Sequence, residues 1–441
     1  MTRFKRILLW SIGSLVLLAI IIIGWLAFMN IDDADPRATQ IAAPLAPLAP
    51  HQLADQIARG AYLTRAGDCM ACHTVRGGQK YAGGRAIVTP FGAIYAPNLT
   101  PDQQTGIGRW NANDFWRALH NGKSKDGSLL YPAFPYTNYT KVSRSDADAM
   151  FAYLQSMPAV KQKNTAPQLR FPYNNRVLLY GWRALYFRPG VYQPESAQSV
   201  EWNRGAYLVQ GLGHCSACHS ARNALGGLNL KGELGGGFIP VVNWYAPSLT
   251  SDVEIGLGDW EISHIAALLK TGVSSRSAAF GPMAEVVSAS LQHLHDKDIT
   301  AMAVYLKTLP RSDGRPVAEK EYARPHEIDQ VLELGAKVYK DNCVACHLTS
   351  GKGAPSAYPP LKGNRAITMP SAVNAIRVVM YGGFAPTTVG NPRPYGMPPF
   401  AQDLTDAEVA AVVSYIRNSW GNSATLVSPS EVNRYRSVPL D

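Results

Sequence analysis

One long apolar stretch near the start of the chain is its first clear pattern. Residues Ile7–Met29 form 23 consecutive positions without a charge, and a helix of that length crosses a bilayer. A cleaved signal peptide usually has a shorter apolar core. The bulky end Trp25–Met29 therefore favours an uncleaved membrane anchor, which comprises residues 1–30. Basic residues precede the stretch and acidic residues follow it, which predicts a cytoplasmic N-terminus (Arg3, Lys5 and Arg6; Asp32, Asp33 and Asp35). An anchor and a signal peptide both deliver the remaining chain to the periplasmic side of the inner membrane.

Beyond the apolar stretch, the pattern divides into a linker and three similar blocks. Residues 31–51 are rich in Ala and Pro without apolar periodicity, which is typical of a linker. In each block, helices flank a long loop region rich in Gly and Pro, which predicts a small all-α domain. The predicted domains are residues 52–160, 201–312 and 325–424, with an interdomain segment at 161–200 and a tail at 425–441. Their final helices are expected near 145–157, 295–309 and 405–420, the last with a capping box of Thr405 and Glu408.

The first two blocks repeat each other. Arg-Gly-Ala-Tyr-Leu stands at both 59–63 and 204–208, and Tyr-Ala-Pro-Asn-Leu-Thr at 95–100 is echoed by Tyr-Ala-Pro-Ser-Leu-Thr at 245–250. The third block is more distant. Between the first two, Phe171–Tyr192 is rich in aromatic residues and arginine. This segment is either a helix packed between domains or a surface that lies on a membrane or a partner.

All six cysteines fall in three copies of the pattern Cys-x-x-Cys-His. This pattern is the attachment signature of c-type haem. Two thiols three residues apart form thioethers to the two vinyl groups of one porphyrin, and the following histidine is the proximal iron ligand. The sequence therefore predicts three covalent haems in three tandem cytochrome c domains. The copies are Cys69, Cys72 and His73; Cys215, Cys218 and His219; and Cys343, Cys346 and His347.

Other chemistries fit the cysteines and the charge less well. A zinc site needs two more ligands per copy, and no second Cys-x-x-Cys stands nearby to supply them. A thioredoxin-like redox pair has no use for the histidine. The net charge of +10 does not indicate nucleic acid as a partner, because haem propionates oppose it; basic patches facing propionates, partners or anionic lipid explain it. No flavin or nucleotide fingerprint and no His-Glu-x-x-His occurs.

The second axial ligand of a cytochrome c haem is usually a methionine before the last helix, and Met/His ligation raises the reduction potential. Met397 stands in this place in the third domain and Met283 in the second. Neighbouring Gly and Pro residues favour a fixed loop there over a packed helix face. In the first domain, Phe134 stands where a methionine is expected. The sequence therefore leaves the sixth ligand of the first haem open.

Over about residues 52–422, the chain resembles the triple-haem cytochrome c subunits of membrane-bound bacterial dehydrogenases. Besides the haem motifs, the resemblance rests on Asn98–Asp102, Thr105–Gly108, Leu130–Tyr136, Trp202–Leu208 and Ser419–Asn422. It implies a chain without catalytic activity of its own. A separate catalytic subunit would oxidise the substrate, and electrons would pass through the haems to ubiquinone in the membrane.

The resemblance leaves the class of the catalytic subunit open. Alcohol dehydrogenase relatives tend to have methionine at the Phe134 position and a shorter loop than Asn391–Met397. Both departures favour a molybdenum-dependent partner with iron–sulfur clusters, such as a membrane aldehyde dehydrogenase. A quinoprotein (PQQ) alcohol dehydrogenase or a flavin-dependent (FAD) sugar or gluconate dehydrogenase is the alternative.

Two other functions compete with this interpretation. A multihaem peroxidase or reductase has one haem without a sixth protein ligand, which the first domain would allow, but no distal acid–base residue is evident. A cytochrome subunit of a haem–copper oxidase also fits an anchored chain, although three haem domains are more than usual for one.

Overall fold

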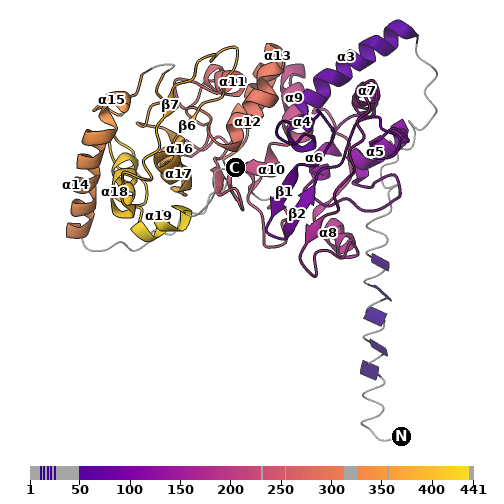
Figure 1. The fold of residues 1–441 in the computed structure, drawn as a ribbon, viewed down its shortest axis with the longest axis horizontal. Helices are drawn as coiled ribbons and strands as arrows, with labels where there is room; N and C mark the ends of the chain where they lie inside the picture. The colour runs from indigo at the N-terminus through magenta and orange to yellow at the C-terminus, as the bar shows by residue number, and fades with distance from the viewer. Residues whose placement is uncertain are drawn as a thin grey trace, which may run out of the picture.

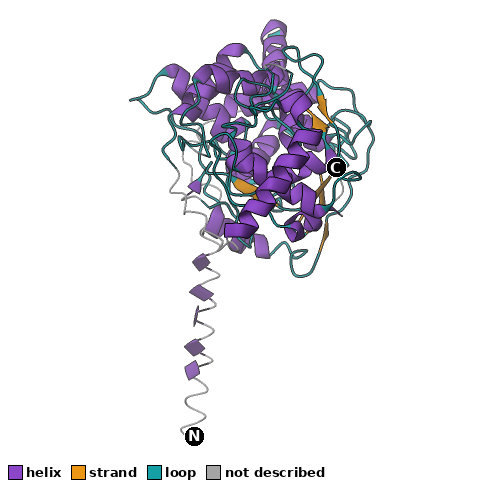
Figure 2. Cartoon of the chain, turned by 90° about the vertical axis from the view of Figure 1, so that its left-hand side faces the viewer, coloured by secondary structure: helices purple, strands orange, loops and turns teal. Residues whose placement is uncertain are grey.

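The computed structural model describes residues 49–436 apart from 230–231, 254, 312–324 and 355–356, together with ten separate positions between 10 and 25. The described chain is mostly helical, with long loops and a few short strands (Figure 2). This composition agrees with the expected all-α class. In Figure 1 three units follow one another across the molecule, with the second between the first and the third.

In the first unit, residues 49–169, the first and last helices pack against each other. Ser143 caps the last of these helices by accepting the Asp146 amide at 3.2 Å. Strands β1, β2 and β3 form a small antiparallel sheet. The elements are α3 (Pro50–Ala66), α4 (Cys69–His73), β1 (Ala86–Thr89), β2 (Gly92–Tyr95), α5 (Ala112–Asn121), α6 (Tyr136–Tyr139), α7 (Arg144–Gln155) and β3 (Gln168–Leu169).

The second unit, residues 200–311, repeats this plan with one added helix. That helix, α12, occupies the region where the first unit has only the single turn α6. The elements are α9 (Val200–Tyr207), the π-helix η2 (Leu208–Leu212), α10 (Ser216–His219), β4 (Gly237–Ile239), β5 (Trp244–Ala246), α11 (Ile262–Thr271), α12 (Pro282–Ala289), the 3₁₀ turn η4 (Leu291–His293) and α13 (Asp296–Lys307).

The third unit, residues 325–436, has its own core and extends beyond the predicted third domain. The predicted capping box is confirmed: Thr405 Oγ1 accepts the Glu408 amide, and Glu408 Oε2 accepts the Thr405 amide at 2.9 Å. The tail contributes a helix, α19, to this unit. The elements are α14 (Pro325–Asn342), α15 (Val344–His347), α16 (Arg365–Thr368), α17 (Val373–Tyr381), β6 (Gly383–Phe384), β7 (Gly396–Met397), α18 (Asp406–Arg417) and α19 (Pro429–Arg436).

A glycine lies at the helix crossing of every unit. A Cβ atom on Gly60 would lie 1.9 Å from the Ala149 carbonyl oxygen, and one on Gly205 would lie 1.9 Å from that of Ala301. In the third unit, a Cβ atom on Gly335 would lie 2.2 Å from the Ala411 carbonyl oxygen. In each unit the first helix therefore touches a later helix backbone to backbone: α3 touches α7, α9 touches α13 and α14 touches α18.

A reciprocal hydrogen bond network joins the first two units. Asp146 accepts from Arg59 of its own unit and from Tyr207 of the second unit, the latter at 2.6 Å. Its side chain is 3% exposed, so both bonds are shielded from water. The same arrangement recurs with the units exchanged: Asp298 accepts from Arg204 at 2.7 Å and from Tyr62 at 2.5 Å.

This network explains why Arg-Gly-Ala-Tyr-Leu repeats in the first two blocks. The arginine binds the aspartate of its own unit, the glycine permits the helix crossing, and the tyrosine reaches the aspartate of the neighbouring unit. In the third unit Leu334 and Lys337 replace the arginine and the tyrosine. The first two units therefore form a pair with approximate two-fold symmetry, and the third attaches by other contacts.

The segment between the first two units contains helix α8 (Leu178–Tyr186). One face packs between the units, because Trp182 donates to the Leu225 carbonyl at 3.0 Å and Arg183 is buried. The other face exposes apolar side chains, including Leu185 at 58%. The buried face agrees with the interpretation of this segment as a helix packed between domains. That its other face lies on a membrane or a partner stays a prediction.

Most of the predicted anchor Ile7–Met29 lies outside the described residues. The ten positions that are described there are helical. Within the described part of the chain, no helix combines the length and apolar character needed to cross a membrane. The predicted linker 31–51 also lies outside the described residues except for its last three positions.

Candidate functional site

Each Cys-x-x-Cys-His sequence forms one short helical turn, α4, α10 or α15, soon after the first helical segment of its unit. None of the six thiols forms a disulfide. Among the described residues, no group of three or more His, Cys, Asp or Glu side chains is arranged to hold a metal ion. The described part of the chain therefore offers the motifs no further ligands of the kind that a zinc site needs.

Burial disfavours the thiolate form of at least one thiol in each motif. Desolvation raises the pKa of Cys69 and of Cys215 to about 12, and that of Cys343 to about 11. Zinc ligands and nucleophiles act as thiolates, which an apolar site disfavours. A pair of neutral, half-enclosed thiols suits thioether formation instead.

The histidines of the first two motifs are held in a neutral, oriented form. Nδ1 of His73 lies 2.7 Å from the Pro97 carbonyl oxygen, and Nδ1 of His219 lies 2.7 Å from that of Pro247. Desolvation lowers the pKa of His73 and lowers that of His219 to about 4. Because Nδ1 donates to a carbonyl, Nε2 is the nitrogen left to bind iron.

Pro97 and Pro247 are functional residues that the sequence analysis did not identify. Both belong to the repeated Tyr-Ala-Pro sequences, but the repetition alone did not indicate a function for either proline. In the third unit Pro359 is the neighbour of His347, and its carbonyl opposes the lowering of the His347 pKa by burial. Nδ1 of His347 is buried, and in the described structure no acceptor meets the distance and angle of a hydrogen bond with it.

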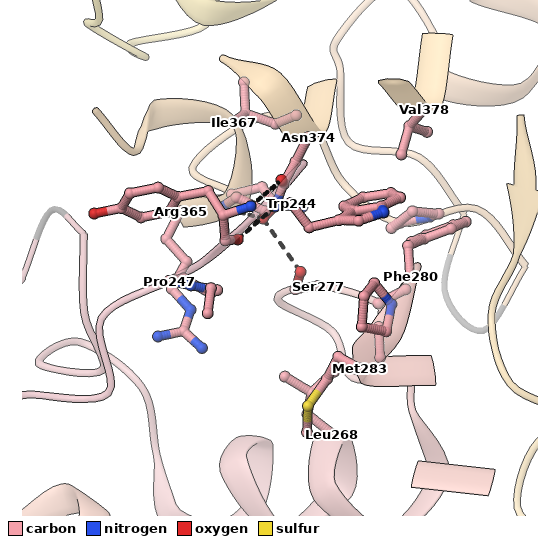
Figure 3. Close-up of a pocket in the computed structure, with 18 of the residues that line it drawn as sticks. Trp244, Pro247, Leu268, Ser277, Phe280, Met283, Arg365, Ile367, Asn374 and Val378 are labelled. Carbon is pink, nitrogen blue, oxygen red and sulfur yellow. Dashed lines mark hydrogen bonds between the residues drawn. The ribbon is translucent and has the colours of Figure 1, made fainter. Parts of the chain in front are cut away.

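The second and third motifs open into one large apolar cavity (Figure 3). It encloses about 2550 Å³ of space, part of it open to solvent, and its wall is mostly apolar. Both predicted methionine ligands lie in its wall, Met283 with the second motif and Met397 with the third. The neutral histidines, the paired thiols, the apolar wall and the methionines together fit c-type haem. A haem held there supplies a one-electron Fe(III)/Fe(II) couple.

Met283 lies on a helix and not in the loop that the sequence analysis expected. Gly281 takes a φ of 56°, and Pro282 then begins α12. Proline is favoured at the first position of a helix because its missing N–H would have no partner there. Met397 lies outside the helices, on the two-residue strand β7.

The first unit carries phenylalanine at the position of Met283. The Leu130 amide donates to the Gly122 carbonyl at 2.8 Å, and the Ala279 amide donates to the Gly272 carbonyl at the same distance. These matching bonds align the two loops, and four residues further along each stands Phe134 or Met283. The Phe134 ring packs against Tyr139, with 5.2 Å between ring centroids. The described structure thus places no sulfur at this position of the first unit.

The first and second motifs lie close together. Arg85 of the first unit pairs with Glu285 on α12 of the second, with 3.1 Å between Nη2 and Oε2, and also donates to the Ala71 carbonyl inside the first motif. Cys218 is near enough to contribute to the raised pKa of Cys72. The second motif therefore neighbours both of the others: the first across this ion pair, and the third across the shared cavity.

Comparisons with known proteins agree with this chemistry. The pattern of the cytochrome c family matches residues 57–158 and 332–420. The alcohol dehydrogenase (quinone) cytochrome c subunit of Gluconobacter oxydans is 39% identical over 87% of this chain and 82% of its own length. The gluconate 2-dehydrogenase cytochrome c subunit of Pantoea cypripedii is 40% identical over 83% and 86%. A nicotinate dehydrogenase subunit of Pseudomonas putida is 40% identical over 93% of this chain and 34% of its own length.

Proposed function

Since the chain belongs to the family of cytochrome c subunits of dehydrogenases, we propose that it carries three covalent haems and passes electrons from a separate catalytic subunit to ubiquinone. Three of its relatives are cytochrome subunits of an alcohol, a gluconate and a fructose dehydrogenase. The haem sites use the cysteines and histidines of the three motifs, with Met283 and Met397 as further iron ligands.

The serial arrangement of the three motifs is the observation that carries this proposal. The second motif neighbours the first across the Arg85–Glu285 ion pair and shares a cavity with the third. Haems attached at the three motifs would therefore form a series, along which an electron that enters at one end can pass from haem to haem to the other end. Oxidation of an alcohol or an aldehyde releases two electrons, and a one-electron relay of this kind needs a partner with a two-electron cofactor.

For the partner we favour a molybdenum-dependent dehydrogenase with iron–sulfur clusters, in particular an aldehyde dehydrogenase. The long loop Asn391–Met397 and phenylalanine at position 134 support this choice over a quinoprotein alcohol dehydrogenase or a flavin-dependent sugar dehydrogenase. The match to a nicotinate dehydrogenase subunit is consistent with a partner outside the alcohol class.

We place the chain at the inner membrane with its haem units on the periplasmic side. Besides the predicted anchor, the exposed face of α8 and its preceding loop supports a membrane contact. Phe171 is 86% exposed, Val177 68% and Leu185 58%, and no acidic residue occurs between Asp148 and Glu195. Exposed apolar side chains among arginines and aromatic residues are typical of surfaces that bind anionic lipid.

An introduced cysteine can test this contact, because haem attachment consumes the native ones. A fluorophore on Leu185→Cys of the full chain in lipid nanodiscs should be quenched by spin-labelled lipid. Val389→Cys, which replaces a 92% exposed residue of the third unit, is the matched control and should not be quenched. Equal signals from both positions would remove the support that α8 lends to the membrane assignment.

The central test is redox behaviour with and without the partner. The isolated chain should be reduced by dithionite but not by ethanol, acetaldehyde or sugars. In the complex purified from membranes, substrate should reduce its haems and a ubiquinone analogue should reoxidise them. Substrate turnover by the isolated chain, or haems that stay oxidised during turnover by the complex, would refute the proposal. The metal and cofactor content of the co-purified subunit decides among the partner classes.

A further inference from the structure

Arg365 is a residue of the third unit whose side chain enters the second. It lies at the start of α16, where the Asn364 side chain caps the helix by accepting the Ala366 amide at 3.0 Å. Its guanidinium stacks 4.9 Å from the ring centroid of Trp260 and donates to the Ser248 carbonyl. Trp260 and Ser248 both belong to the second unit, and Arg365 lines the cavity that the second and third motifs share (Figure 3).

The charge of Arg365 lacks an acidic partner in the described structure. The residue is 7% exposed, and burial lowers its pKa to about 10, which still leaves it positively charged at neutral pH. No described carboxylate forms an ion pair with it. Asp259, whose charge acts on Arg365, is itself paired with Arg276 at 3.1 Å. A buried cation in an apolar cavity is unfavourable unless an anion neutralises it.

We propose that Arg365 binds a propionate of the haem attached to Cys215 and Cys218. This inference rests on the proposed haem attachment in the second unit. A haem propionate is a carboxylate, and arginine binds carboxylates through two parallel hydrogen bonds. The position selects the second haem over the third. Ser248 directly follows Pro247, whose carbonyl holds His219, and the charge of Arg365 acts on His219.

Arg365 of the third unit therefore binds the haem of the second unit. A positive charge beside a haem favours the Fe(II) state over the more positive Fe(III) state, so Arg365 raises the reduction potential of the second haem. Without it, a buried propionate would have no counter-charge and would take up a proton more readily. The potential of that haem would then change with pH over a range where the native potential does not.

The test compares three variants of the full haem-loaded chain. Arg365→Gln removes the charge, and Arg365→Lys keeps it but cannot form two parallel bonds. Lys270→Gln is the matched control, because it removes a partly exposed lysine of the second unit that is paired with the exposed Asp296. Spectroelectrochemical titration at several pH values should show one of the three potentials lowered and pH-dependent in Arg365→Gln. Lys270→Gln should leave all three near their native values. Adding Met283→Ala identifies the haem, because both changes should then act on the same one.

An infrared measurement gives an independent readout. With haem labelled with ¹³C at its propionates, the labelled carboxylate bands of the redox difference spectrum should shift in both Arg365 variants and stay unshifted in Lys270→Gln. If Arg365→Gln does not retain the second haem, Arg365→Lys carries the infrared comparison alone. Unchanged labelled bands in the Arg365 variants, or a shift confined to the third haem, would overturn the inference. A mass that shows no haem on Cys215 and Cys218 in the native chain would instead contradict the proposed function.

Discussion

Replacement of Gly205 by alanine gives the sharpest test of how the units are built. The new Cβ would lie 1.9 Å from the Ala301 carbonyl oxygen, whereas ordinary contacts begin at 3.4 Å, so α9 and α13 would have to separate by about 1.5 Å. Protein interiors are close-packed, and overpacking of this kind costs roughly 1–3 kcal/mol or more. The higher helix propensity of alanine offsets up to about 1 kcal/mol of this cost. We expect Gly205→Ala to destabilise the second unit by about 2 kcal/mol.

Gly211→Ala is the matched control for this prediction. Gly211 lies in the π-helix that follows α9, and a Cβ there would meet its nearest atom, Cβ of Lys141, at 3.4 Å. Denaturant unfolding of the haem-loaded chain, followed by circular dichroism and haem absorbance, should show an early transition in Gly205→Ala that Gly211→Ala lacks. Separate transitions are expected because a chain of several units does not unfold in one step. Equal stability of the two variants would show that the helices do not cross at the described distance.

The remaining predictions concern the haems and the interface between the first two units. Intact mass should exceed the polypeptide by three haem groups, and a mass with two groups or fewer would contradict the proposed count. Met283→Ala and Met397→Ala should each remove one methionine–iron charge-transfer contribution and lower one potential; two wild-type spectra would reject both assignments. Phe134→Met should add such a contribution and remove any carbon monoxide binding at the first haem, whereas an unchanged spectrum would show that this position does not face the iron. Tyr62→Phe removes a hydrogen bond to a charged group and should weaken the interface by roughly 1.5–3 kcal/mol in thermal unfolding; no loss would mean that the bond is replaced by water. Burial raises the pKa of Asp298, but its bonds to Arg204 and Tyr62 outweigh this and leave the pKa below its ordinary 3.8. The aspartate therefore stabilises the fold above the ordinary pKa, and this contribution should be lost as the pH falls through the lowered value; unfolding midpoints that do not change in acid would refute it.

Local chemistry made much of the site predictable from sequence. Cys-x-x-Cys-His is a contiguous motif, so the six cysteines and three histidines could be named without knowing the fold. The structure brings Met283 and Met397 into one cavity with His219 and His347, although ligation itself stays a prediction. The helix at Met283 was missed because a Gly-Pro pair marks both loops and helix starts.

Contacts between units could not be predicted in the same way. The bond from Tyr62 to Asp298 joins residues 236 positions apart, and Arg365 reaches its neighbours only after the third unit docks on the second. Such contacts depend on how finished domains fit together, which no local pattern encodes. The repeat did hold a signal, since the arginine and tyrosine of Arg-Gly-Ala-Tyr-Leu are present in the two paired units and absent from the third.

The shared cavity also constrains how the chain matures. With only one of the second and third haems in place, the cavity would remain partly empty, and its apolar wall would be open to water. If haem attaches at both motifs, as we propose, filling one half still leaves the wall of the other half open to water until its own haem arrives. Haem insertion at these two sites should then be coupled in free energy, even though each covalent attachment is a separate chemical event. Partly loaded chains should accordingly be short-lived, and a mutation that blocks attachment at Cys343 should lower the yield of chains loaded at Cys215 as well.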